Sequence, residues 1–112
     1  MILNFNNIEE TVIPQFKGGE GETISRMLFD GFNKIMVGHL PVGSTIGCHK
    51  HEVNSEIIYI LSGDAKCLYD DGEEFLKPGE CHYCPMGHSH SLINNSSSEE
   101  LVFFAVVPEH KK

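Results

Sequence analysis

Short apolar segments rich in β-branched and aromatic residues recur along most of the chain, and turn sequences rich in glycine, proline, asparagine and aspartate separate them. This pattern predicts eight strands, at residues 24–29, 34–40, 56–61, 65–69, 73–77, 80–84, 89–94 and 101–107. One separating sequence, Asp70-Asp71-Gly72, ends in the Asp-Gly pair that is a strong hairpin signal. No window keeps a helical apolar period for three turns, although Ile8 and Val12, four residues apart, indicate a short N-terminal turn.

Many short, closely spaced strands with almost no helix predict an all-β sandwich or barrel. A length of 112 residues suits one domain. We therefore expect a single domain over residues 1–112, with an N-terminal arm at about 1–22 and a barrel at about 23–108. Closing the sheet into a barrel would remove its exposed strand edges.

The charge balance excludes several classes of partner. Sixteen acidic and eight basic residues give a formal net charge of −8, and no stripe of Lys or Arg interrupts it, so we expect no nucleic-acid partner. No segment approaches the roughly 20 apolar residues of a membrane helix, and the N-terminus lacks the pattern of a signal peptide. We expect a cytoplasmic protein without membrane contact, whose four cysteines are reduced.

Histidines are concentrated near the ends of the predicted strands. The chain has seven, and four of them are His49, His51, His88 and His90. Residues two apart in a strand point to the same face, so His49 and His51 can reach one cation together.

Glu56 and His90 extend this pair into a set of metal ligands. Glu56 begins an apolar run that suits a barrel interior, where an unpaired carboxylate is costly and a metal ion would relieve the cost. Three neutral imidazoles and one carboxylate suit a borderline divalent ion and leave positions open for water or substrate. We predict that His49, His51, Glu56 and His90 bind one divalent metal ion.

The other histidines and the cysteines could also bind metal or take part in redox chemistry, but their positions favour simpler interpretations. We expect His88 to be a rim residue or a hydrogen-bond donor to a ligand rather than a fifth ligand. His39 and His82 lie within strands and are interpreted as core or surface residues, with facing the pocket as the alternative. Cys81 and Cys84 are three apart in a strand, which puts them on opposite faces and favours core packing over zinc binding or redox chemistry.

Two segments have a regular spacing of glycine, histidine and other fixed residues. In residues 43–63 the fixed positions are Gly43, His49, His51, Glu56 and Gly63, and in residues 79–94 they are Gly79, Pro85, Gly87, His90 and Asn94. These segments resemble the two signature motifs of the cupin superfamily, with every fixed position filled. The resemblance implies a jelly-roll barrel, also called a double-stranded β-helix, with a metal near its centre held by the four predicted ligands.

The resemblance also implies a class of function. Three histidines and a glutamate are similar to the ligand sets of manganese or iron cupins such as oxalate decarboxylases, oxalate oxidases and cupin dioxygenases. We therefore expect a metal-dependent enzyme of decarboxylase or dioxygenase type that acts on a small carboxylate or enediol, with Mn or Fe favoured and Zn or Ni as alternatives. This chain departs from the decarboxylases, which have two cupin domains. A decarboxylase needs a proton donor, and Glu52 and His88 are the candidates.

Two other functions stay open. One is a non-catalytic cupin that binds or senses a small ligand, although such cupins often lose metal ligands and this chain keeps all four. The other is isomerisation of a sugar or uronate. Small cupins commonly pair through sheet edges, so we also expect a homodimer, in which residues 1–30 could supply an exchanged strand.

Overall fold

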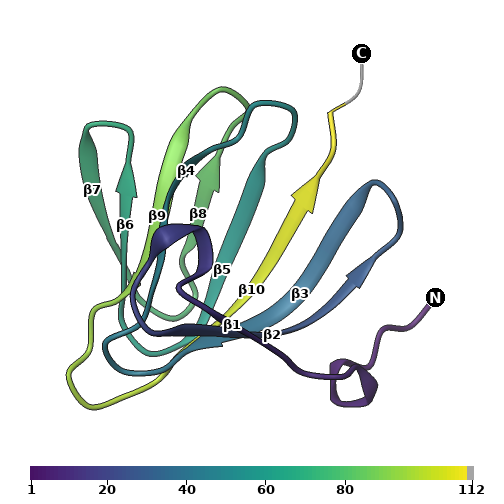
Figure 1. Ribbon diagram of the computed structural model, residues 1–112, viewed down its shortest axis with the longest axis horizontal. Helices are drawn as coiled ribbons and strands as arrows, with labels where there is room; N and C mark the ends of the chain where they lie inside the picture. The colour runs from purple at the N-terminus through teal and green to yellow at the C-terminus, as the bar shows by residue number, and fades with distance from the viewer. Residues whose placement is uncertain (111–112) are drawn as a thin grey trace.

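The computed structural model describes residues 1–110 and folds them into two antiparallel sheets that face each other (Figure 1). The strands are β1 (Thr11–Pro14), β2 (Glu22–Phe29), β3 (Asn33–Leu40), β4 (Thr45–Lys50), β5 (Glu56–Ser62), β6 (Ala65–Tyr69), β7 (Gly72–Leu76), β8 (Cys81–Cys84), β9 (Ser89–Asn94) and β10 (Leu101–Pro108). Two short 3-10 helices, η1 (Phe5–Asn7) and η2 (Phe16–Gly18), precede β1 and β2. The six-stranded sheet has the order β1-β2-β3-β10-β5-β8, and the four-stranded sheet has the order β4-β9-β6-β7.

The predicted all-β architecture is confirmed, and each of the eight predicted strands is present within two residues of its expected ends. The prediction missed β1 and β4, which contain Pro14 and Gly47, two residue types that are unfavourable inside strands. A short N-terminal turn is present but lies earlier than expected, because η1 ends at Asn7 with Ile8 as its C-cap, and Val12 belongs to β1. Hydrogen bonds do not close the strands into one continuous sheet, because β1 and β8 remain as edges of one sheet and β4 and β7 as edges of the other, as in a jelly roll made of two facing sheets.

The core lies between the two sheets and is built from alternate residues of the strands. In β10 every second residue from Leu101 to Val107 is buried, as the period of two requires. Phe103 is the largest of the fully buried side chains, and its ring occupies the space above Gly38. A Cβ atom at Gly38 would lie 2.6 Å from Cζ of that ring. Gly38 therefore allows a large aromatic side chain to fill the interior.

The glycine-rich segment after η2 packs its backbone directly against β4. A Cβ atom at Gly19 would lie 2.1 Å from the carbonyl oxygen of Thr45, and one at Gly47 would lie 2.1 Å from that of Lys17. Lys17 itself has a left-handed backbone conformation, with φ of 56°. This close contact places η2 over β4 next to the cavity described below.

The structure explains why glycine and asparagine occupy fixed positions in the two sequence motifs. Gly43 and Gly63 have φ of 81° and 91°, a region that favours glycine. The Asn94 side chain donates hydrogen bonds to the carbonyl oxygens of Leu40 and Glu99, both at 2.9 Å. It is therefore a residue that satisfies backbone groups, as expected.

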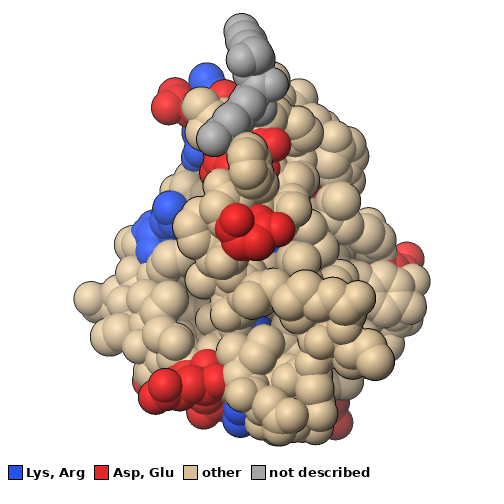
Figure 2. All heavy atoms as spheres, turned by 90° about the vertical axis from the view of Figure 1, so that its right-hand side faces the viewer, with Lys and Arg blue, Asp and Glu red and all other residues tan. Residues whose placement is uncertain are grey.

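The excess of acidic over basic residues is visible on the surface of the protein. Figure 2 shows separate patches of Asp and Glu on one face of the molecule, with few Lys or Arg atoms between them. No helix within residues 1–110 is long and apolar enough to cross a membrane.

Candidate metal centre

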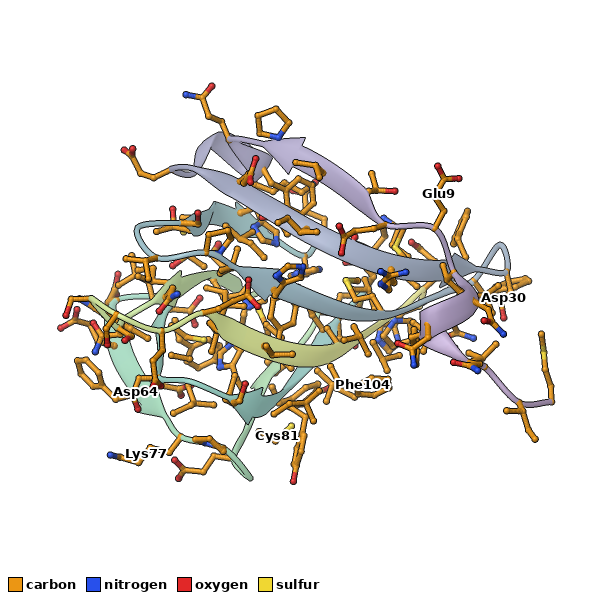
Figure 3. The ribbon with its side chains drawn as sticks, turned by 90° about the horizontal axis from the view of Figure 1, so that it is seen from below. Glu9, Asp30, Asp64, Lys77, Cys81 and Phe104 are labelled. Carbon is orange, nitrogen blue, oxygen red and sulfur yellow. The ribbon has the colours of Figure 1, made fainter. Side chains whose placement is uncertain are left out.

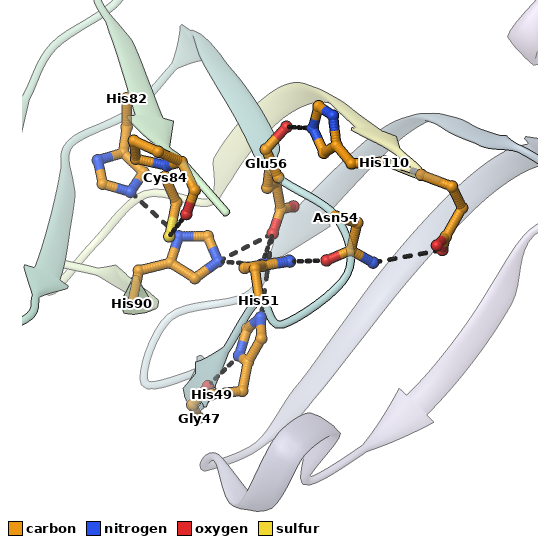
Figure 4. Close-up of polar contacts among 12 residues, drawn as sticks. Gly47, His49, His51, Asn54, Glu56, His82, Cys84, His90 and His110 are labelled. Atoms are coloured by element: carbon orange, nitrogen blue, oxygen red, sulfur yellow. Dashed lines mark hydrogen bonds and ion pairs between the residues drawn. The ribbon is translucent and has the colours of Figure 1, made fainter. Parts of the chain in front are cut away.

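The structure brings the four predicted ligands together between the two sheets (Figure 4). His49 lies near the end of β4, His51 directly after that strand, Glu56 at the start of β5 and His90 in β9. Their donor atoms all lie within 4.8 Å of one another. Glu56 is the one member of the group that comes from the six-stranded sheet.

Strand register explains how residues far apart in the sequence meet. His49 and His90 are direct partners in the antiparallel pair of β4 and β9. Beyond the end of β4, the His51 amide donates to the carbonyl oxygen of His88, and the Gly87 amide donates to that of His51. These bonds continue the pairing past the strand end, so His51 stays next to His90.

The spacing of the donor atoms fits a single ion. Nε2 of His51 lies 2.9 Å from Nε2 of His90, and Oε1 of Glu56 lies 3.2 Å and 2.9 Å from these two atoms. Donors at right angles and about 2.1 Å from one ion are about 3.0 Å apart, and donors on opposite sides are about 4.2 Å apart. Nε2 of His49 lies 4.0 Å from Oε1 of Glu56, close to the second value.

Hydrogen bonds at the far side of each imidazole orient the rings. Nδ1 of His49 donates to the Gly47 carbonyl oxygen at 2.7 Å, and Nδ1 of His51 bonds to Oδ1 of Asn54 at 2.5 Å. When Nδ1 carries the proton, Nε2 offers its lone pair, which is the tautomer that a metal ligand requires. Both rings are therefore set to bind a cation through Nε2.

His90 is held by a longer chain of hydrogen bonds. Its Nδ1 lies 3.0 Å from Nε2 of His82, and Nδ1 of His82 lies 2.7 Å from Oε1 of Glu74. His82 is buried, whereas half of the Glu74 side chain is exposed. When Nδ1 of His90 donates its proton to Nε2 of His82, and Nδ1 of His82 donates to Glu74, the lone pair on Nε2 of His90 is free to bind a metal. His82 is therefore a buried residue with both nitrogens hydrogen-bonded, as one of the interpretations from the sequence had it, and it does not line the cavity.

A second group of metal-binding types, His82, Cys84 and His90, overlaps the first. Both nitrogens of His82 already have partners. Burial raises the pKa of the Cys84 thiol to about 11, and nearby carboxylates add to the effect. A thiol must lose its proton to bind a metal, so the group that contains Glu56 has the better donors.

The electrostatics of Glu56 also favour a cation. Burial acts to raise the pKa of Glu56, but the close contacts with His51 and His90 outweigh it and lower the pKa to about 2. The hydrogen bond to Glu56 raises the pKa of His51, whereas burial lowers the pKa of His49. Glu56 is thus an ionised, buried carboxylate surrounded by imidazoles, the charge state in which carboxylates bind metals.

A cavity of about 290 Å³ opens beside this group. His49, His51, Asn54 and Glu56 form one part of its wall. Its apolar lining comes from β1, η2, β2, β3, β4 and β10 and consists of Ile13, Phe16, Met27, Met36, Ile46, Phe103 and Val107. A small molecule in this cavity would meet His49, His51 and Glu56, three of the four predicted ligands.

The other candidates from the sequence lie away from the group. Glu52 is exposed and does not line the cavity. The His88 side chain turns to Asp70, 2.6 Å away, and stacks on Tyr69. His39 is bound by the exposed carboxylate of Glu100 at 2.6 Å. None of the three touches the donor atoms of the centre.

The two cysteines of the C-x-x-C sequence lie on opposite faces of β8, as expected. Cys84 is buried, but Cys81 is exposed, so core packing is wrong for Cys81. The sequence reasoning also missed the support from the C-terminal segment. Nε2 of His110 bonds to the Ser55 hydroxyl at 2.8 Å, and Glu109 accepts a bond from Asn54, which fastens the loop between His51 and Glu56.

Replacing His82 with phenylalanine is expected to weaken metal binding about tenfold or more, because loss of a residue that orients a ligand typically has this effect. Competition with a chelator of known affinity measures the change. His39→Phe is the matched control, since His39 bonds to Glu100 away from the centre. Equal metal affinity in the two variants would show that the hydrogen bond to His90 does not contribute.

Comparison with known proteins agrees with the fold and the motifs. The sequence matches the Cupin domain family over residues 36–107. An oxalate-binding protein from Thermotoga maritima is 32% identical over 114 residues, covering 96% of this chain and 93% of the relative. The crystal structure of a T. maritima protein described as a predicted oxalate decarboxylase has a TM-score of 0.90 and 30% identity, covering 97% of this chain and 99% of that chain. A cupin from Shewanella frigidimarina has a TM-score of 0.80 at 14% identity, covering 99% and 92% of the two chains, which is a likeness of fold alone.

The fold is a jelly roll of two β-sheets. Three histidines and a glutamate that could hold a metal ion meet between these sheets, beside a cavity. The family match and the 32% identical relative show that this chain belongs to the cupin domain family.

Proposed function

We propose that this protein holds one divalent metal ion through His49, His51, Glu56 and His90 and binds a small carboxylate next to it. The observation that carries the proposal is the convergence of three imidazole nitrogens and one carboxylate oxygen. His49, His51 and Glu56 of this group also line a cavity. The relative described as an oxalate-binding protein supports a carboxylate as the ligand.

The side chains of this centre would each contribute to binding. A bound divalent ion supplies a Lewis acid that attracts carboxylate or carbonyl oxygens. His49, His51 and His90 present Nε2, and their Nδ1 partners keep the rings from turning. The apolar wall excludes water, which strengthens electrostatic interactions inside the cavity.

Catalysis of the decarboxylase or dioxygenase type is the second candidate function. Retention of all four predicted ligands favours it over a purely structural metal. Glu56 is the single carboxyl group in the cavity lining within residues 1–110, so the proton donor that a decarboxylase needs is not among the carboxyl groups there. Glu52 and His88, the candidates from the sequence, would have to act from outside the cavity. This arrangement favours ligand binding as the first function to test.

Isomerisation of a sugar or uronate is a weaker fit to the lining. Seven of the cavity residues are apolar side chains from the N-terminal half of the chain and β10, whereas a sugar needs many hydrogen-bond partners. Resemblance to a sugar phosphate isomerase from Silicibacter pomeroyi, with a TM-score of 0.76 at 21% identity, concerns the fold alone.

Titration calorimetry with oxalate tests the proposal. We expect one oxalate to bind per metal ion in protein loaded with Mn²⁺ and no binding in protein stripped of metal, because the ion supplies the main attraction. His90→Ala is expected to abolish binding, while His39→Ala, a histidine on the outer face, serves as control. Oxalate binding that persists without metal would overturn the proposal. Oxalate turnover that disappears in His49→Ala and His90→Ala would add the enzymatic function.

Several finer proposals accompany this function. We favour Mn or Fe as the metal, with Zn or Ni as alternatives, and a single-domain protein in the cytoplasm.

We also propose a homodimer. Its support is an apolar strip on the outer face of β5 and β8, where Ile57 pairs with Tyr83 and Tyr59 pairs with Cys81. Figure 3 shows Cys81 and Phe104 projecting to this outer side of the sheet.

A further inference from the structure

Basic side chains gather at the cavity of a protein that is acidic overall. Lys17, Lys34 and Lys50 line the cavity, and Glu56 is the one carboxylate among the described lining residues. The whole chain has 16 acidic and eight basic residues, so the local balance is opposite to the global one. None of the ion pairs within residues 1–110 includes these three lysines. Lysine side chains that border a cavity without a carboxylate partner attract an anionic ligand.

Lys34 lies two strands away from Glu56 on the inner face of the six-stranded sheet. It pairs with Val107 across β3 and β10, and Val106 pairs with Ile57 across β10 and β5. Val107 therefore separates Lys34 from Glu56. Since neighbouring strands are about 4.8 Å apart, the backbones of Lys34 and Glu56 are about 10 Å apart. Lys34 is thus placed to bind a group of the ligand that is several bonds away from the atoms at the metal centre.

Lys17 approaches the same cavity from η2. The contact of its carbonyl oxygen with Gly47 fixes this residue over β4. Lys17 lines the cavity together with His51 and Lys34. Lys17 and Lys34 come from different sides of the cavity, so a second anionic group could lie between them.

The wall between the metal centre and Lys34 is apolar, with Met36, Phe103 and Val107 as its main side chains. Such a surface suits a short methylene chain rather than a hydroxyl-rich one. Thr23 adds one polar group to the lining: it is 3% exposed, and its hydroxyl has no hydrogen-bond partner among the described residues. An unsatisfied buried hydroxyl is unfavourable, and an oxygen of the occupant is a group that could satisfy it.

Building on the proposed metal and carboxylate site, we propose that the cavity binds an anion with two charged ends. An oxygen-rich carboxylate end lies at the metal group, a short methylene chain follows the apolar wall, and a second anionic group lies at Lys34 and Lys17. The cavity of about 290 Å³ is near the lower limit, about 300 Å³, of sites that enclose drug-sized ligands, so it has room for more than a two-carbon acid.

Two matched hydroxy acids test this proposal by calorimetry on the Mn²⁺-loaded protein. 2-Hydroxyglutarate and 2-hydroxyvalerate share the end that would face the metal, but only the first has a second carboxylate. We expect 2-hydroxyglutarate to bind about tenfold tighter, the usual gain from a hydrogen bond between charged groups. Lys34→Gln is expected to reduce this ratio about fivefold, the value of a partly exposed ion pair, without changing metal content or oxalate binding. Lys77→Gln, after β7, is the control.

The outcomes separate this proposal from the one on which it rests. Oxalate binding together with equal affinities for the two hydroxy acids would overturn the two-ended ligand and keep the metal and carboxylate site. No binding of oxalate or either hydroxy acid to the metal-loaded protein would overturn both. If Lys34→Gln fails to fold, Lys17→Gln provides the same comparison. A ratio left unchanged by the folded variants would exclude the lysines as the second anion site.

Discussion

Replacing Glu56 with glutamine is expected to remove the metal ion from this protein. The single oxygen Oε1 of Glu56 lies within 4.0 Å of Nε2 of all three histidines, and the amide of glutamine keeps the shape but not the charge. We expect metal affinity to fall by at least about 100-fold, the upper end of the loss seen when residues that only support a ligand are changed. Elemental analysis of protein purified without a nickel column or chelator measures the result.

Glu52→Gln is the control for this experiment. It removes a carboxylate four residues earlier in the chain, on an exposed side chain that does not line the cavity. We expect it to retain about one equivalent of metal, the content that we also expect of the native protein. Full metal content in Glu56→Gln would contradict the proposed ligand set. So would a native protein that takes up no Mn²⁺, Fe²⁺, Ni²⁺ or Zn²⁺.

Replacing Phe103 with alanine is expected to lower the free energy of unfolding by about 3–5 kcal/mol, the usual range for truncating a buried aromatic residue. Phe103 is 1% exposed and fills the interior above Gly38. The lower end of the range is expected, because the ring also borders the cavity, and water can enter part of the vacated space. Urea denaturation of native and variant protein with the same metal content measures the difference.

Phe104→Ala is a matched control for the loss of an aromatic ring from the same strand. Phe104 faces outward, is only partly buried and contacts Phe5, with ring centroids 6.2 Å apart. We expect it to change the free energy of unfolding by about 1 kcal/mol, a common value for a single substitution. Equal losses in the two variants would mean that the interior position of Phe103 is not the main source of its stabilisation.

The strands could be predicted from the sequence where side-chain patterns are strong. The alternation in β10, with Leu101 and Phe103 pointing inward, is visible in the sequence itself. The strand β4 could not be recognised in this way, because Gly47 lies in it and its pairing with β9 shifts register between Ile46 and His49. Its existence depends on a partner strand more than 40 residues later, and local patterns do not contain that information.

The four members of the candidate centre could be selected from the sequence through their spacing and the family resemblance. That they bind a metal stays a prediction. The contact of His82 with His90 could not be predicted, since its strand pattern indicates only a core or surface residue, with the pocket as the alternative. Its function in orienting His90 follows from the register that places β8 beside β5 and the fold that packs β9 against it. The lysines at the cavity were not recognised either, because Lys17 and Lys34 border one cavity only when η2 lies over β4.

Gly47 contacts both η2, the short helix beside the cavity, and the candidate metal centre. Its missing side chain leaves room for the Lys17 carbonyl oxygen, while its own carbonyl oxygen holds the His49 ring. A ligand that displaces Lys17 would therefore also shift the residue that sets the orientation of His49. Occupancy of the cavity and the coordination of the ion are then coupled through one backbone position, without any side chain in between.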